Sequence, residues 1–377
     1  MINWEEQIKL PEKAPEIEYA YILYSDEKPI SCSKEELFKA IERRNDIHYV
    51  TTPQNNGFII PGMDYDTLQP ILRRRMSASD NQLFLGFFFT ILFGLLYFLF
   101  CFLANKWIEI DSSFKFYLVI VGLIPIISEW YERYSIRNIN ESNYQQESSQ
   151  IKFSYWIQQE NIRSIYIVIV ILVTITFLQI ITGLKNSIAL AGLVKPQTLN
   201  GEYWRLLTCI LMHGNLFHIL LNSAAISTIG LLVVRLSSFS HFLIVFLFSG
   251  LLGSISSLYL IPTHSSIGAS GCIMGLIGFI LVMSLTFLNS IPRKILRAIL
   301  LSILWVAIMG LINYDIVDNA AHGGGLIGGI IAGLILVRRK NNVIPYQPTK
   351  LIYILGIISA VILLGGIFII IRKLIYA

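Results

Sequence analysis

The chain has 377 residues, of which 54% are hydrophobic and only 14% are charged, and its formal net charge is +5. Because soluble domains carry about 25% charged residues, this composition excludes an ordinary soluble protein and predicts one that crosses a membrane several times. The small positive excess fits basic loops beside a membrane better than nucleic-acid binding, since no basic and aromatic patch accompanies it. The four cysteines are scattered, so we expect neither a disulfide framework nor a metal cluster.

The first 80 residues are the only sizeable soluble part, and they predict a small α+β domain. Short strands are expected at 19–24 and 57–60. The sequence Ser33-Lys-Glu-Glu36 is a capping box, which predicts a helix running to about Arg44. The residues do not specify a role for this domain, and we expect a cytosolic appendage or a module that binds an unknown cytosolic partner.

Two apolar segments follow, at about 83–104 and 114–130, and each is long enough or nearly long enough to cross a ~30 Å hydrocarbon core. A polar linker at 131–163, rich in Asn, Gln and Ser, separates them from a block of seven further apolar segments. These seven are expected at about 164–184, 216–235, 241–261, 269–288, 294–313, 320–337 and 351–371.

The chain is therefore expected to have three parts. Residues 1–80 form the soluble domain, residues 81–163 contain two extra transmembrane helices and the linker, and residues 164–377 contain the seven-helix block. The basic clusters Arg73-Arg74-Arg75 and Arg338-Arg339-Lys340 both fall on the inner side if nine spans start from an inner N-terminus. We therefore expect a cytosolic N-terminus.

Four polar side chains lie where the second, fourth and sixth helices of the block enter the membrane from the outer face. They are His218 and Asn222, then Ser270, then His322. Polar groups at bilayer depth are costly, so we interpret this convergence as a functional site. An imidazole ~3 Å from a serine hydroxyl can accept its proton and return it to a leaving amine. The pattern predicts a serine hydrolase.

No carboxylate lies within the seven spans, which favours a dyad over a triad. Asp318 and Asn319 precede the sixth helix and are better explained as its N-cap. Free backbone N–H groups at the start of the Ser270 helix are candidate oxyanion donors. His218 and Asn222, four residues apart on one face, could add side-chain donors, although Asn222 could equally join helices and His218 could be an interfacial histidine.

Small residues accompany the two candidate catalytic side chains. His322, Gly325 and Gly329 share one helical stripe, and Ser270 and Gly271 begin a comparable face. Such glycine faces most often only pack helices together. Because Ser270 and His322 lie on them, we expect these two faces to bring the hydroxyl and the imidazole into contact.

These residues resemble the rhomboid family of intramembrane serine proteases. The resemblance covers about residues 164–371 and implies a six-helix core with one additional C-terminal helix; the first two spans and the soluble domain lie outside it. The matching pieces are Trp204-Arg205, His213-x4-His218-x3-Asn222, Gly268-Ala269-Ser270-Gly271 and Ala321-His322-x2-Gly325-x3-Gly329.

The resemblance implies that Ser270 is the nucleophile and His322 the general base, with His218, Asn222 and the Ser270 backbone N–H as the oxyanion hole. Trp204-Arg205 would belong to a loop dipping into the outer leaflet. The family cleaves transmembrane helices of other membrane proteins near their outer ends and needs no cofactor. The site of this chain would accordingly face the extracytoplasmic side of the cell membrane.

Two further residues near the candidate site have expected roles. His213 is expected to be a structural hydrogen-bonding residue of the outer loop. Met274 stands where many relatives carry an aromatic residue beneath the histidine, and a thioether can also pack against imidazole. One alternative is a non-catalytic relative that binds transmembrane clients, although such relatives usually lack the serine or the histidine.

Two other classes fit the sequence less well. A transporter would generally need an intramembrane carboxylate or broken helices with facing termini, and the core spans contain no Asp or Glu. A zinc protease would need a His-Glu-x-x-His pattern, which is absent from the sequence.

Overall fold

The computed structural model divides the chain into two compact units, one within residues 5–159 and the other within 160–377, and each is described separately. The structure describes residues 8, 10–11, 18–25, 28–44, 46–55, 57–103, 124–158, 163–261, 264–288, 290–337, 344 and 346–376.

The N-terminal unit contains a three-stranded antiparallel sheet with the strand order β2-β1-β3. Its strands are β1 (Ala20–Leu23), β2 (Ile30–Ser31) and β3 (Ile47–Thr51). Helix α1 (Lys34–Arg43) begins at the expected capping box, with the Ser33 N–H donating to the Glu36 carboxylate at 2.9 Å. In place of the expected strand at 57–60 the structure has isolated bridge residues, one of which, Ile59, pairs with Val50 of β3.

A single long helix, α2 (Tyr65–Leu103), runs through the position near residue 80 where the soluble part was expected to end. At about 1.5 Å per residue it is about 58 Å long, far more than a ~30 Å hydrocarbon core requires. The polar region at 131–163 was expected to be a linker, but within it lie the end of α4 (Ile124–Arg137) and all of α5 (Tyr144–Gln158). The second extra span, expected at 114–130, falls mostly outside the described residues.

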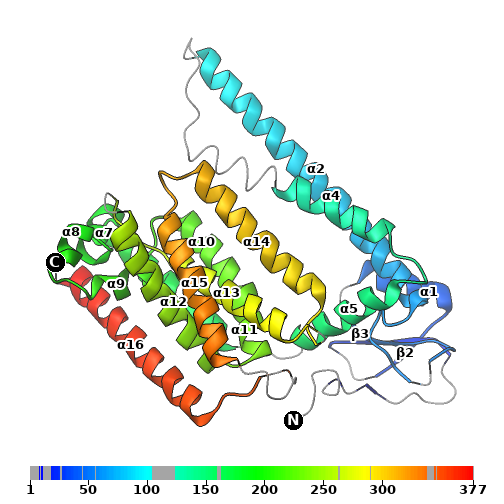
Figure 1. Ribbon diagram of the computed structural model, residues 1–377. Coiled ribbons are helices and arrows are strands. Elements are labelled where there is room, and N and C mark those ends of the chain that lie inside the picture. Colours follow the sequence, from blue (N-terminus) through cyan, green and yellow to red (C-terminus); the bar gives the residue numbers. More distant parts are fainter. Residues whose placement is uncertain are drawn as a thin grey trace. The chain divides into compact units, whose positions relative to one another are not determined.

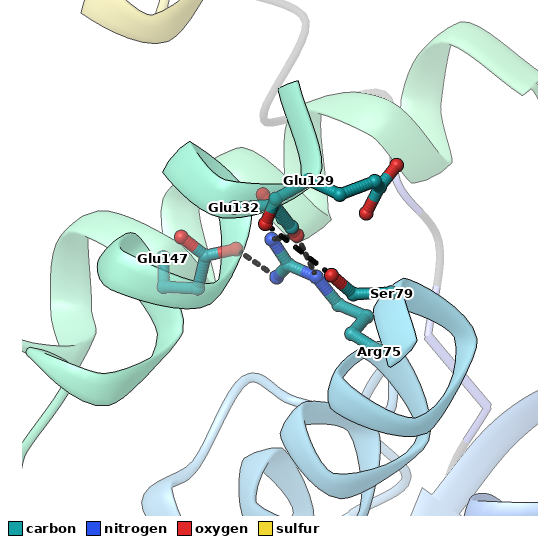
Figure 2. Close-up of polar contacts among 5 residues, drawn as sticks. All are labelled: Arg75, Ser79, Glu129, Glu132 and Glu147. Carbon is teal, nitrogen blue, oxygen red and sulfur yellow. Dashed lines mark hydrogen bonds and ion pairs between the residues drawn. The ribbon is translucent and has the colours of Figure 1, made fainter. Parts of the chain in front are cut away.

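One arginine fastens these three helices together. Figure 2 shows Arg75 of α2 reaching Glu132 of α4 and Glu147 of α5. The Arg75 Nε lies 2.8 Å from the Glu132 carboxylate, and the Ser79 hydroxyl donates to the Glu129 carbonyl at 3.3 Å. Because Glu147 is buried, its charge depends on Arg75 for compensation. These contacts join α2, α4 and α5 into one packed group of helices.

The C-terminal unit is a helical bundle, and each of its seven expected apolar segments is a helix (Figure 1). Three short helices and a 3₁₀ turn fold the long loop after the first span. The spans are α6 (Arg163–Ile181), α10 (Leu216–Ala225) continued by a π turn (Ile226–Gly230) and α11 (Leu231–Leu236), α12 (Phe239–Leu260), α13 (Ser270–Thr286), α14 (Arg293–Ile312), α15 (Asn319–Leu336) and α16 (Lys350–Ile375). The loop elements are α7 (Leu184–Ala191), α8 (Lys195–Leu199), α9 (Arg205–Thr208) and η3 (Cys209–Leu211).

Helix α13 is the centre of this bundle, since nearly all of its residues from Gly271 to Ser284 are buried. It packs against α12 and α15, while α16 lies against α12 and α14 lies against α13 (Figure 1). Among the described residues, seven helices are long and apolar enough to cross a membrane, namely α2 and six of the C-terminal unit; α13, at 17 residues, is shorter. The predicted class, an all-α polytopic membrane protein with a small α+β N-terminal domain, is confirmed.

Candidate active site

The serine and the histidine singled out in the sequence meet in the structure. Ser270 is the first residue of α13, and His322 lies in the first turn of α15. The Ser270 Oγ and the His322 Nε2 lie 2.9 Å apart, which is hydrogen-bond distance. Both residues are partly buried. This geometry allows the imidazole to accept a proton from the hydroxyl.

Close backbone packing produces this contact. A Cβ added at Gly325 would lie 2.1 Å from the Gly271 carbonyl oxygen, and one added at Gly329 would lie 1.8 Å from the Gly275 carbonyl oxygen. No real side chain tolerates such distances, so α13 and α15 touch through bare backbone along two turns. Gly271, Gly325 and Gly329 therefore lie where the backbones of α13 and α15 approach each other closely.

The imidazole of His322 has one described hydrogen-bond partner, the serine. Its Nδ1 is buried and has no hydrogen-bond partner among the described residues. A third group that would orient the ring through Nδ1, as the aspartate of a triad does, is therefore not seen in the described part of the chain. Met274, one turn along α13 from the serine, is buried.

His218 and Asn222 lie on α10, whose start is capped by Asn215. The Asn215 side chain accepts the His218 N–H at 2.8 Å. Asn222 is 5% exposed, and its Nδ2 is a buried donor without an acceptor among the described residues. Because an unsatisfied buried amide is costly, this donor has free capacity for a group that arrives with a reactant.

Gly268 has a different position from the helix-packing one expected for it. It lies in the loop before α13 with a φ of +127°, a conformation that favours glycine. A Cβ there would lie 2.7 Å from the His218 Cε1. Gly268 therefore lets the loop pass directly against the His218 ring, which places that ring beside the start of α13.

The Trp204-Arg205 pair organises the loop between the first two spans of the bundle. Arg205 is 4% exposed; it donates to the Gly192 carbonyl at 2.8 Å and pairs with Glu202 at 2.5 Å. Its guanidinium also lies 4.7 Å from the centre of the Trp204 ring, and Lys373 of α16 lies over the same ring at 5.1 Å. Through these contacts the pair holds the loop together and joins it to α16.

His213 fastens the end of the same loop to α6. Its backbone N–H donates to the Gln179 side chain at 2.9 Å, and the Gln179 amide donates to the His213 carbonyl at 3.1 Å. Its ring lies 3.3 Å from the Thr176 hydroxyl and packs edge-on against the ring of His218. Burial, and then the neighbouring His218, lowers the pKa of His213 to about 3, so it is neutral near pH 7.

The sequence analysis did not identify two residues that hold the loop and the start of α15 in place, Gln179 and Ser257. Gln179 was a detectable signal, since it is a lone amide in an otherwise apolar segment, and it is fully buried. Ser257 of α12, whose hydroxyl donates to the Asp318 carboxylate, gave no signal because serines are common in packed helices. Among the described residues, no group of three or more His, Cys, Asp or Glu side chains could hold a metal ion.

The bundle is similar to known proteins. Residues 200–339 match the sequence family described as the Rhomboid domain. The chain is 34% identical to the rhomboid protease GluP of Bacillus subtilis over 158 residues, which cover 41% of this chain and 30% of that protein. It is 34% identical to the putative rhomboid protease YdcA of the same organism over 144 residues, 38% of this chain and 72% of that protein.

A plant protein matches over a similar length. RHOMBOID-like protein 4 of Arabidopsis thaliana is 34% identical over 150 residues, which cover 39% of this chain and 38% of that protein. The chain thus spans less than two fifths of GluP and of the plant relative, and almost three quarters of YdcA.

Proposed function

This chain belongs to the rhomboid family, and we propose that it is an intramembrane serine protease that cleaves transmembrane helices of other membrane proteins. Family membership supports intramembrane proteolysis in general, but several relatives are named only rhomboid-like. The proposal for this chain therefore depends on its own residues. The observation that carries it is the 2.9 Å distance between the Ser270 hydroxyl and the His322 imidazole.

The reaction follows from this pair. As the Ser270 Oγ attacks the carbonyl carbon of a peptide bond, the His322 Nε2 takes the hydroxyl proton. The C–N bond then breaks, the imidazolium gives its proton to the departing amine, and an acyl-enzyme ester remains on Ser270. Water, deprotonated by His322, attacks this ester, and the proton returns to the serine oxygen as the carboxylic acid product leaves.

Negative charge develops on the carbonyl oxygen during both attacks, and we assign its stabilisation to His218, Asn222 and the Ser270 backbone N–H. The free Nδ2 of Asn222 and the helix start at Ser270 support this assignment. Donors fixed before the reaction require no rearrangement when the charge appears. Removing one such donor costs about 10²- to 10³-fold in rate.

The proposed topology places the dyad at the extracytoplasmic side of the cell membrane, with the N-terminus in the cytosol. The argument is the positive-inside rule applied to the basic loops. The substrate is then a transmembrane segment that reaches the site from the bilayer and is cut near its outer end. The N-terminal unit is a candidate to bind a cytosolic partner.

A fluorophosphonate probe, which reacts with activated serines, tests the proposal in the full chain reconstituted in liposomes. We expect labelling of the wild type, loss of labelling in Ser270→Ala and His322→Ala, and parallel loss of cleavage of a single-span reporter. Asn222→Ala should slow cleavage of the reporter without abolishing it. Ser265→Ala, at an exposed serine in the loop before α13, is the matched control and should label normally.

Two results would contradict the proposal. Reporter cleavage by His322→Ala at the wild-type rate would show that the dyad is wrong. A folded wild type that is neither labelled nor active, but that binds the reporter, would instead indicate a non-catalytic protein that binds transmembrane clients.

A further inference from the structure

The aspartate before α15 makes two contacts that converge on the turn bearing His322. The Asp318 Oδ1 accepts the Ala321 N–H at 2.9 Å and so caps the helix, and its Oδ2 accepts the hydroxyl of Ser257 on α12. The Asp318 carbonyl also accepts the His322 N–H at 3.1 Å. One side chain thus joins the first turn of α15 to a second helix.

The same turn is confined by backbone on both of its neighbours. A Cβ at Gly253 of α12 would lie 2.7 Å from the Ala321 carbonyl oxygen, and a Cβ at Gly271 of α13 would lie 3.2 Å from it. Gly253 and Ser257 are four residues apart, so they present one face of α12 to the start of α15. The turn therefore lies against α12 at two adjacent points and against α13 at a third.

The ring of His322 depends on this turn for its position. With Nδ1 unpartnered among the described residues, its only described hydrogen bond is the one to the serine. Whatever sets the backbone from Asp318 to His322 therefore sets the approach of Nε2 to the serine oxygen. A reacting group misplaced by 1 Å can cost about 10²-fold in rate.

We propose that Asp318, through its bond to Ser257, is the positioning residue that aims His322 at Ser270. This inference rests on the proposed function of the dyad. The positioning effect comes from hydrogen bonding to the side chain of Asp318 and not from its negative charge, because both carboxylate oxygens accept from neutral donors. Asparagine, which is also a strong N-cap residue, can accept the Ala321 N–H through its oxygen and donate from its amide to the Ser257 hydroxyl, whereas alanine can make neither contact.

The test compares reporter cleavage by four variants of the full chain in liposomes, each normalised to the folded fraction. We expect Asp318→Ala to lower kcat about 10- to 100-fold with KM changed less than about twofold, and Asp318→Asn to stay within about threefold of the wild type. Ser257→Ala, which leaves the cap intact, should lower kcat by several-fold. Asp66→Ala, at an exposed aspartate in the first turn of α2, is the control and should behave as the wild type.

A double substitution and hydrogen exchange complete the test. Asp318→Ala combined with Ser257→Ala should be no slower than Asp318→Ala alone, since Asp318→Ala already removes the hydrogen bond with Ser257. Deuterium uptake of the peptide around residues 318–326 should rise in Asp318→Ala and stay near the wild-type level in Asp318→Asn. This second readout needs no activity.

The outcomes separate this inference from the proposed function. A wild type without labelling or cleavage refutes the protease, while the exchange measurement still decides whether Asp318 holds the turn. Wild-type kcat in both Asp318→Ala and Ser257→Ala overturns the positioning role. Equal losses in Asp318→Asn and Asp318→Ala overturn it as well, because the negative charge would then be what matters.

Discussion

Replacing Gly325 by alanine should separate the dyad without touching either member of it. The new Cβ would lie 2.1 Å from the Gly271 carbonyl oxygen, whereas ordinary van der Waals contact begins at 3.4 Å. The helices must therefore move apart by about 1.3 Å at this turn, since both contacting groups are backbone or bonded to it. Adding that displacement to the 2.9 Å between the Ser270 Oγ and the His322 Nε2 gives about 4.2 Å, beyond any hydrogen bond.

The expected consequence is a fall of about 10²-fold in fluorophosphonate labelling of Ser270, measured as a second-order rate at equal folded protein. Overpacking should also cost about 1–3 kcal/mol of stability, read from thermal unfolding in detergent. Gly323→Ala is the matched control, because a Cβ there meets nothing within 4 Å. Labelling of Gly325→Ala at the rate of Gly323→Ala would refute the argument that bare backbone contact sets the dyad distance.

Two further substitutions test other parts of the structure. Gly268→Ala should lower kcat about 10-fold or more by pushing the His218 ring away, whereas Gly201→Ala, at the similar φ of +111° with nothing within 4 Å, should leave reporter cleavage unchanged. Arg75→Met should destabilise the N-terminal unit by about 3 kcal/mol, because a buried carboxylate loses its partner. Arg73→Met breaks only an exposed ion pair and should cost less than about 1 kcal/mol; equal proteolysis of both variants in urea would contradict this.

The helical bundle could be predicted from the sequence because a membrane leaves few alternatives. Backbone N–H and C=O groups must form hydrogen bonds within each span, so a run of about 20 apolar residues predicts a helix. Alternating spans then place the starts of α10, α13 and α15 at one end of the bundle, which brings Ser270 and His322 to one level. Spacing of small residues on one face predicted the close contact of α13 with α15.

The N-terminal unit was harder to predict because its organisation depends on contacts distant in sequence. Arg75 reads as part of a basic cluster before a span, yet it pairs with Glu132 and Glu147, more than 50 residues away. The segment containing those glutamates is polar and of mixed composition, which resembles a linker. Helices α4 and α5 each supply a carboxylate to the same guanidinium, and this shared contact is not visible in the local sequence.

Gly268 shows a similar limit within the site. In the sequence it precedes Gly271 by three residues, and the pattern predicts one more small residue of a packing face. Its role comes instead from a positive φ in a loop and from a histidine 50 residues earlier. Neither the φ angle of Gly268 nor its contact with the His218 ring can be predicted from the neighbouring residues in the sequence.

If Ser270 and His322 act as proposed, their arrangement suggests how a serine hydrolase could work without a third catalytic group. In a triad, a carboxylate holds the imidazole through Nδ1 and so fixes its orientation. Here the Nδ1 of His322 has no such partner among the described residues, and the ring is carried by a turn held between α12 and α13. If backbone packing replaces the third group, substitutions that only add volume at Gly325 or remove the tie at Asp318 should lower kcat while substrate binding remains. Loss of substrate binding with kcat preserved in both variants would show that packing orders the substrate site instead.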